Sequence, residues 1–226
     1  MLKKSRLKRL FHFFVNDSDF YHLKGSTWDI TMERVCNVVL CIFYVYFIYG
    51  QLSHRDDYLR WDIVIFTLKM TMEAIFFLSR KMPKNFSIGP YTWFVTLFAV
   101  NSVLLMRPEA PGTYFTAGLV LMHIGFILHI IALSFLGRSF GIIPANREIK
   151  TSGVYGFVRH PLYLSIFITI TGYLIANPSN LNFAIYVSGI FFHILRIFEE
   201  ERLLRKDRDY EEYIEKVRWR VVPGLF

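Results

Sequence analysis

Long apolar runs separated by short polar segments make up most of the chain. A helix that crosses a bilayer needs about 20 predominantly apolar residues. Six runs approach that length, at residues 35–52, 61–79, 91–106, 114–136, 162–176 and 181–198. The turn-forming segment 177–180 joins the last two, which predicts a helical hairpin whose members need not both reach the far face. The pattern predicts an all-α fold: a polytopic membrane helix bundle with five to six transmembrane helices and a C-terminal helical hairpin.

The basic residues are distributed unevenly among the segments that connect these runs. Lys and Arg counted over alternate segments give 22 on one side of the predicted membrane and three on the other. Cytosolic loops carry the basic excess, so we expect both termini and the segment 137–161 in the cytosol. The net charge of +8 then indicates contact with membrane lipids rather than nucleic acid. An integral, multi-pass protein of a bacterial inner membrane or the endoplasmic reticulum is expected.

Composition supports the same class and suggests three regions. The chain is 54% hydrophobic and 18% aromatic, whereas soluble domains are about 45–50% apolar. Residues 1–34 form a basic segment, either a helix on the cytosolic membrane surface or a frayed tail. Residues 35–132 carry the N-terminal transmembrane helices, and residues 133–226 carry most of the chemistry-bearing side chains.

Several ionisable residues lie within the apolar runs, where such groups usually face the protein interior. Asp62, Lys69 and Glu73 fall on one helical face, and we expect a buried ion pair between Lys69 and Glu73. A contact of these residues with substrate is the alternative. His123 and His129 are more often hydrogen-bonded packing residues than ligands, and the sequence has no metal-binding spacing.

Two segments place polar side chains at the cytosolic edge. His193, Arg196 and Glu200 lie on one stripe where the sixth run ends, although Arg196 and Glu200 could also form a plain surface pair. The loop before the fifth run carries Tyr155 and His160 close to a helix start at Pro161. Because this loop is short, we expect it to meet the end of the sixth helix in a concave polar site. A basic loop that binds lipid head groups is the alternative.

These motifs resemble those of the isoprenylcysteine carboxyl methyltransferase family, a group related to phospholipid N-methyltransferases. The matching residues are Gly153-Val154-Tyr155, Arg159-His160-Pro161-Leu162-Tyr163, Arg196-Ile197-Phe198-Glu199-Glu200, Leu203, Tyr210-Glu211-Glu212-Tyr213 and Pro223. The resemblance covers roughly residues 133–226. In one departure, the isoprenylcysteine enzymes carry a cofactor-contacting glutamine near the position of Ala145, and their loop is longer.

The resemblance implies an integral-membrane helical fold with a cytosolic pocket for S-adenosyl-L-methionine. It implies that the cofactor is contacted by Arg147, Glu148, Ile149, Lys150, Tyr155, His160, Pro161, Leu162, Tyr163 and Glu200. Arg196 would meet the methyl acceptor, so that Arg196 and Glu200 are the candidate catalytic residues. The implied acceptor is a lipidic, prenylcysteine-like or other small molecule.

The type of acceptor decides which further chemistry is needed. A carboxylate is already a nucleophile at neutral pH, and Arg196 could orient it through a bidentate pair. An amine or thiol must lose a proton, which makes Glu200 or His160 a candidate base. Carboxyl O-methylation is favoured, with phospholipid N-methylation and thiol S-methylation as alternatives. An NADPH-dependent membrane reductase of related fold and a non-catalytic membrane scaffold are the other two hypotheses.

Overall fold

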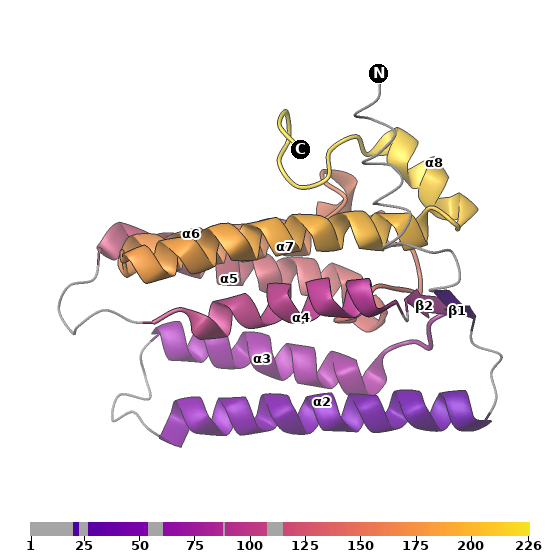
Figure 1. Ribbon diagram of the computed structural model, residues 1–226, viewed down its shortest axis with the longest axis horizontal. Helices are drawn as coiled ribbons and strands as arrows, with labels where there is room; N and C mark the ends of the chain where they lie inside the picture. The colour runs from indigo at the N-terminus through magenta and orange to yellow at the C-terminus, as the bar shows by residue number, and fades with distance from the viewer. Residues whose placement is uncertain (1–19, 23–26, 54–60, 88, 108–114) are drawn as a thin grey trace.

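In the described part of the chain, six long helices run side by side, and a shorter one follows them (Figure 1). The structure is a computed structural model, and it describes residues 20–22, 27–53, 61–87, 89–107 and 115–226. The helices are α2 (Thr27–Ser53), α3 (Trp61–Ser79), α4 (Pro90–Leu105), α5 (Thr116–Leu136), α6 (Pro161–Ala176), α7 (Asn180–Leu204) and α8 (Arg208–Lys216). Each predicted apolar run corresponds to one long helix, and α6 begins at the predicted Pro161. The predominantly helical fold is therefore confirmed.

A small antiparallel sheet is the main departure from the all-α prediction. Its strands are β1 (Phe20–His22), β2 (Asn85–Ser87) and β3 (Ala145–Asn146), in the order β1-β2-β3. Asn85 pairs with Asn146, and Phe86 pairs with Ala145. Strands of two or three residues are too short to produce a recognisable alternation of apolar and polar residues. The sheet lies at the end of the bundle where α8 is found (Figure 1).

Helices α5 and α6 approach each other closely because glycines lie where they cross. A Cβ atom on Gly172 of α6 would lie 2.4 Å from the backbone nitrogen of Met122 on α5. A Cβ atom on Gly118 of α5 would lie 2.3 Å from the backbone nitrogen of Ala176. Small residues at such crossings allow backbones to pack together, as in membrane helix pairs. This close packing fixes the position of the helix that begins beside the candidate site.

Substituting Gly172 by alanine is expected to destabilise the protein, since the new methyl group would meet backbone atoms that cannot rotate away. Overpacking of this kind costs about 1–3 kcal/mol, or roughly 3–10 °C in melting temperature. Thermal unfolding of the detergent-purified variant measures the effect. Gly50→Ala is the matched control, because a Cβ at Gly50 has no atom within 4 Å. Equal melting temperatures for the two variants would contradict the packing argument.

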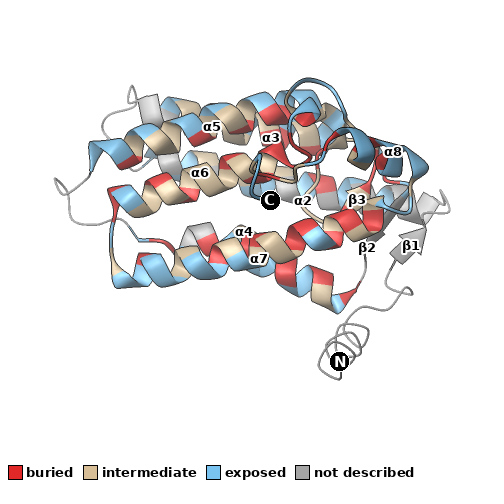
Figure 2. Cartoon of the chain, turned by 90° about the horizontal axis from the view of Figure 1, so that it is seen from above, coloured by how far each residue is buried: buried red, intermediate tan, exposed pale blue. Residues whose placement is uncertain are grey.

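The outer faces of the helices are strongly apolar. Among the described residues, Ile42, Tyr46, Leu105 and Phe183 are each more than half exposed, and pale-blue exposed positions recur along the helices in Figure 2. Within the same residues, two helices are long and apolar enough to cross a membrane, Thr116–Ser139 and Asn180–Leu204. Large exposed apolar surface of this kind marks a surface that meets lipid or another protein.

A buried polar network crosses from α3 to α6 within the bundle. Lys69 Nζ lies 2.9 Å from Glu73 Oε1, so the predicted ion pair is confirmed. His129 Nε2 lies 2.8 Å from the same oxygen, and His129 Nδ1 lies 3.0 Å from Ser165 Oγ. His129 is therefore the hydrogen-bonded packing residue that was expected. His123 is one too, because its Nδ1 lies 2.6 Å from the carbonyl oxygen of Leu119.

Some sequence predictions concern residues that the structure does not describe. Most of the basic segment 1–34 lies outside the described residues, as does the side chain of Asp62. The division into three regions stays a prediction.

Candidate functional site

A cavity of about 570 Å³ opens between the loop before α6 and the C-terminal end of α7. Its size falls within the range of small-molecule sites, roughly 300–1,000 Å³. The predicted site residues that line it are Arg147, Glu148, Ile149, Lys150, Tyr155, His160, Leu162, Tyr163, Arg196 and Glu200. Pro161 begins α6 and is not part of the lining. The structure thus brings together side chains from two segments that are distant in sequence.

The stripe on α7 faces this cavity as the helical spacing predicted. Tyr163 on α6 donates a hydrogen bond from its hydroxyl to Glu200 Oε2 at 2.7 Å. The Arg196 guanidinium lies over the Tyr163 ring, 5.4 Å from its centroid, and donates to the carbonyl oxygen of Ile142. Arg196 and Glu200 are therefore not a plain surface pair. Arg196 is buried, and its Nε has no hydrogen-bond partner among the described residues.

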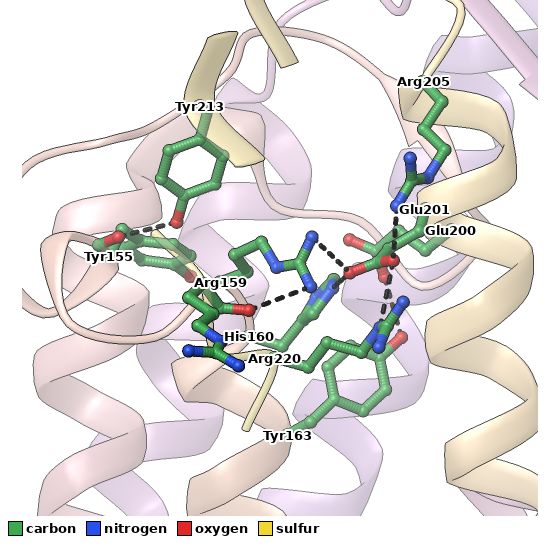
Figure 3. A network of polar contacts seen from close by, with 10 residues as sticks. Tyr155, Arg159, His160, Tyr163, Glu200, Glu201, Arg205, Tyr213 and Arg220 are labelled. Carbon is green, nitrogen blue, oxygen red and sulfur yellow. Dashed lines mark hydrogen bonds and ion pairs between the residues drawn. The ribbon is translucent and has the colours of Figure 1, made fainter. Parts of the chain in front are cut away.

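Glu201 forms the centre of the polar network, and the sequence reasoning missed it (Figure 3). Its Oε1 lies 3.3 Å from both His160 Nε2 and Arg159 Nη1, and its Oε2 lies 3.1 Å from Arg220 Nε. The side chain of Arg205 approaches the same carboxylate at 3.7 Å. The run Glu199-Glu200-Glu201 showed three acids, but helical angles measured from His193 favoured Glu200. The sequence did not show that Arg159, His160 and Arg220 would meet at Glu201.

The C-terminal tail packs over the start of α6. The backbone N–H of Arg159 donates to the carbonyl oxygen of Trp219 at 2.9 Å, and that of His160 to the carbonyl of Arg220 at 2.8 Å. Val221, which is fully buried, packs with Tyr163 and Ile197. The tail and Glu201 together fix the backbone and the imidazole of His160.

The loop 145–150 is held by contacts on both sides. Lys81 and Lys150 both bind the Glu148 carboxylate, and their hydrogen bonds lower the pKa of Glu148 to about 2. Arg147 Nε donates to the carbonyl oxygen of Lys81 at 2.9 Å. Ala145, near which the resemblance places a glutamine in the isoprenylcysteine enzymes, lies in β3 and lines the cavity. The backbone of this loop is thus ordered without a side-chain amide at position 145.

Asp207 joins the same loop to α8. Its Oδ2 accepts hydrogen bonds from Asn146 Nδ2 at 2.8 Å and from Lys84 Nζ at 3.0 Å. The bond from Asn146, followed by the bond from Lys84, lowers the pKa of Asp207. These contacts hold the loop against α8, whose residues Tyr210 and Tyr213 also line the cavity.

Tyr155 lines the cavity with a hydroxyl that is available for hydrogen bonding to a ligand. The residue is 6% exposed, and its hydroxyl has no hydrogen-bond partner in the described part of the chain. Its backbone carbonyl accepts a hydrogen bond from the Tyr213 hydroxyl at 2.6 Å, which fixes its position. Burial, and then the negative charge of Glu200, raise the pKa of Tyr155 well above its usual value. The hydroxyl is therefore protonated at neutral pH and can donate to a ligand.

The cavity continues from this polar end into the apolar interior of the bundle. The side chains that line this part are mostly apolar, although the Lys69–Glu73 ion pair also reaches it. The apolar ones include Phe43, Phe66, Met70, Phe126 and Ile166, from α2, α3, α5 and α6. Two of these helices, α2 and α3, lie wholly before residues 133–226, the part of the sequence that carries the family motifs. The site as a whole can therefore hold a polar group at one end and a hydrocarbon at the other.

Comparisons with known proteins find similarity to methyltransferases by name. Residues 113–209 match a family model described as phospholipid methyltransferase. The chain is 34% identical over 125 residues to a probable protein-S-isoprenylcysteine O-methyltransferase of Oryza sativa subsp. indica, covering 50% of this chain and 64% of the relative. It is 36% identical over 110 residues to protein-S-isoprenylcysteine O-methyltransferase B of Arabidopsis thaliana, covering 44% and 55%. Over its C-terminal half the chain is therefore similar to isoprenylcysteine and phospholipid methyltransferases.

The resemblance to isoprenylcysteine carboxyl methyltransferases seen in the sequence is thus confirmed. The chain spans less than two thirds of the length of the relatives it matches, 64% in the rice protein. The family match runs from just before α5 into α8, so it includes both cavity-forming segments but not α2, α3 or α4. The match to the phospholipid methyltransferase model and the two long apolar helices together indicate a membrane protein.

Proposed function

We propose that the protein is a membrane-embedded, S-adenosyl-L-methionine-dependent methyltransferase that acts on a lipidic or prenylcysteine-like acceptor, with carboxyl O-methylation favoured. The observation that carries the proposal is the single cavity with a polar end beside Tyr155 and Glu200 and an apolar extension among the helices. Such a cavity accommodates a polar methyl donor and an amphiphilic acceptor side by side. Enzymes that only align two reactants gain much of their rate from this proximity.

The polar end fits the chemical groups of the proposed cofactor. S-adenosylmethionine would supply a methyl group on a sulfonium, which is already activated for transfer. The Glu200 carboxylate and the faces of Tyr155 and Tyr163 are suited to cationic groups. Arg147 and Lys150 supply positive charge at the same end for a carboxylate. The free Tyr155 hydroxyl provides a hydrogen-bond donor inside the cavity.

Arg196 is the residue proposed to bind the acceptor. A carboxylate needs no base at neutral pH, because its ordinary pKa is about 4. The buried guanidinium, with an unpartnered Nε within the described structure, can hold that carboxylate by charge and hydrogen bonding. The apolar extension would hold the hydrocarbon part of the same molecule.

We also propose a multi-pass topology with both termini in the cytosol. The charge distribution supports it, with 22 basic residues on one side against three on the other. The arrangement in Figure 1 supports it too, because the described segments 80–87, 137–160 and 205–216 gather at one end of the bundle. The cavity's polar end lies there, on the side where the methyl donor is made in cells.

Phospholipid N-methylation is the second candidate, favoured by the description of the matching family model. An amine acceptor would have to lose a proton. Glu200 is then the candidate base, because His160 is already bound to Glu201 in the structure.

Ligand binding and methyl transfer by the purified protein test the proposal. Calorimetry in detergent is expected to show binding of S-adenosylhomocysteine and none of NADPH. With radiolabelled methyl donor and a panel of N-acetyl-S-farnesylcysteine, phosphatidylethanolamine and small thiols, label is expected in the prenylcysteine ester. Transfer to the phospholipid would favour the second candidate. Binding of NADPH alone would indicate a reductase, and binding of neither cofactor would indicate a scaffold.

A further inference from the structure

His193 lies on α7 one helical turn before Arg196, and its side chain lines the cavity. The residue is 2% exposed. Its ring packs edge-on against Tyr163, with centroids 5.9 Å apart, and against Phe167 at 6.1 Å. The imidazole is thus held in place by packing against two aromatic rings at the cavity wall.

Neither ring nitrogen of His193 has a hydrogen-bond partner among the residues that the structure describes. The two other buried histidines of the cavity differ in this respect. The nitrogens of His129 meet Glu73 and Ser165, and His160 Nε2 lies 3.3 Å from Glu201 Oε1. Leaving a buried polar group without a partner is destabilising, because the group has lost its hydrogen bonds to water. His193 bears this cost in the protein alone, and a ligand that supplied an oxygen would remove it.

The neighbouring Arg196 also has one nitrogen without a hydrogen-bond partner among the described residues. Its Nε is also unpartnered within the described residues, although its Nη2 donates to the Ile142 carbonyl. Side chains three residues apart on a helix project from the same face, with Cβ atoms about 5–6 Å apart. Whatever its protonation state, an imidazole carries at least one N–H. The Nε–H of Arg196 and an imidazole N–H of His193 therefore lie on the same face of α7. Two such donors match the two oxygens of a carboxylate.

We propose that His193 donates a hydrogen bond to the carboxylate of the methyl acceptor, beside Arg196, and so selects acceptors that carry this group. The inference rests on the proposed methyltransferase function and adds a specificity residue to it. Arg196 supplies the charge, whereas His193 supplies a directed donor. A site built around hydrogen bonds rejects an analogue that lacks the bonded group much more strongly than a purely apolar site does. Methylation removes the negative charge, so the ester product is held less tightly than the substrate.

Binding of two matched ligands tests the role of His193. N-acetyl-S-farnesylcysteine carries the carboxylate, and N-acetyl-S-farnesylcysteamine is the same molecule without it. Calorimetry in detergent, with and without S-adenosylhomocysteine, is applied to the wild type, His193→Gln and His193→Phe. We expect His193→Phe to weaken carboxylate binding about 10- to 100-fold, since hydrogen bonds to charged groups contribute about 1.5–3 kcal/mol. His193→Gln, which keeps an N–H donor, is expected to bind within about fivefold of the wild type.

The other arms separate a ligand contact from a structural effect. Affinities for the cysteamine analogue and for S-adenosylhomocysteine should not change in either variant. His123→Phe is the matched control, because His123 bonds its own helix and does not line the cavity. Unchanged carboxylate binding in His193→Phe would overturn the inference. Equal weakening of both farnesyl ligands would do the same, as would loss of binding in His193→Gln comparable to the loss in His193→Phe.

A measurement on the wild type covers the case in which the variants do not fold. With ¹⁵N-labelled histidine, the His193 ring signals should shift on addition of the carboxylate ligand and stay in place with the cysteamine analogue. Identical responses to the two ligands would overturn the inference. If the protein binds S-adenosylhomocysteine but not the farnesyl carboxylate, His193 has no such role while the methyltransferase function stands. If S-adenosylhomocysteine does not bind, the proposed function fails and the methyl-acceptor role of His193 fails with it; the comparison without the cofactor product then shows only whether His193 binds a carboxylate.

Discussion

Replacing Glu201 by glutamine is expected to produce the largest loss of stability and of cofactor binding. The carboxylate is 2% exposed and holds Arg159, His160 and Arg220 at 3.1–3.3 Å. Removing its charge leaves buried cations without a counter-charge, which costs about 3–5 kcal/mol. The start of α6 and the C-terminal tail should separate, which disorders the polar end of the cavity. Thermal unfolding should shift down by more than 6 °C, and calorimetry should show no binding of S-adenosylhomocysteine.

Glu212→Gln on α8 provides the matched control. Its carboxylate is 57% exposed and lies 3.5 Å from Arg208 Nε, in an ion pair at the surface. Exposed pairs of this type contribute about 0–1 kcal/mol, so the melting temperature and cofactor affinity should stay near those of the wild type. If Glu201→Gln behaved like Glu212→Gln, the central role assigned to Glu201 would be wrong.

The second large effect is expected at Arg196. In Arg196→Ala, kcat/KM for a carboxylate acceptor should fall about 30-fold or more, because truncating one partner of a buried charge pair costs about 2–5 kcal/mol. The affinity for S-adenosylhomocysteine should change much less, since Arg196 is proposed to contact the acceptor. Arg196→Lys should recover little activity, because an ammonium group cannot reproduce the planar fork of donors. Initial rates with N-acetyl-S-farnesylcysteine, together with calorimetry, measure both quantities.

Arg208→Ala serves as the control for Arg196, because the Arg208 side chain is 89% exposed. Its kcat/KM should equal that of the wild type. An Arg196→Ala protein with unchanged turnover would refute the acceptor role. A loss of cofactor affinity as large as the loss of kcat/KM would instead show that Arg196 acts by holding the loop at Ile142.

The positions of the long helices could be predicted closely from the sequence. The predicted run 61–79 coincides with α3, and α6 begins at Pro161, the predicted helix start. The run 35–52 fell eight residues short of the start of α2 at Thr27, because polar residues there interrupt the apolar pattern. Apolar length and helix-starting residues are local properties, and local properties are visible in a sequence.

The candidate site could be predicted in part. The helical repeat placed His193, Arg196 and Glu200 on one face, and all three line the cavity. The repeat did not indicate Glu201, whose importance comes from cations contributed by the α6 start and the C-terminal tail. It also could not show that the nitrogens of His193 lack partners within the described chain.

The sequence by itself determined the membrane-type helical pattern, the family motifs and the face of α7 that carries the polar stripe. Each of these depends on spacing along one segment. The tertiary structure decided which acid is the centre of the network, how the loop 145–150 is held, and how far the cavity extends between Phe43 and Ile166. These features depend on side chains from several helices meeting in space, and a linear pattern does not contain the distances between helices.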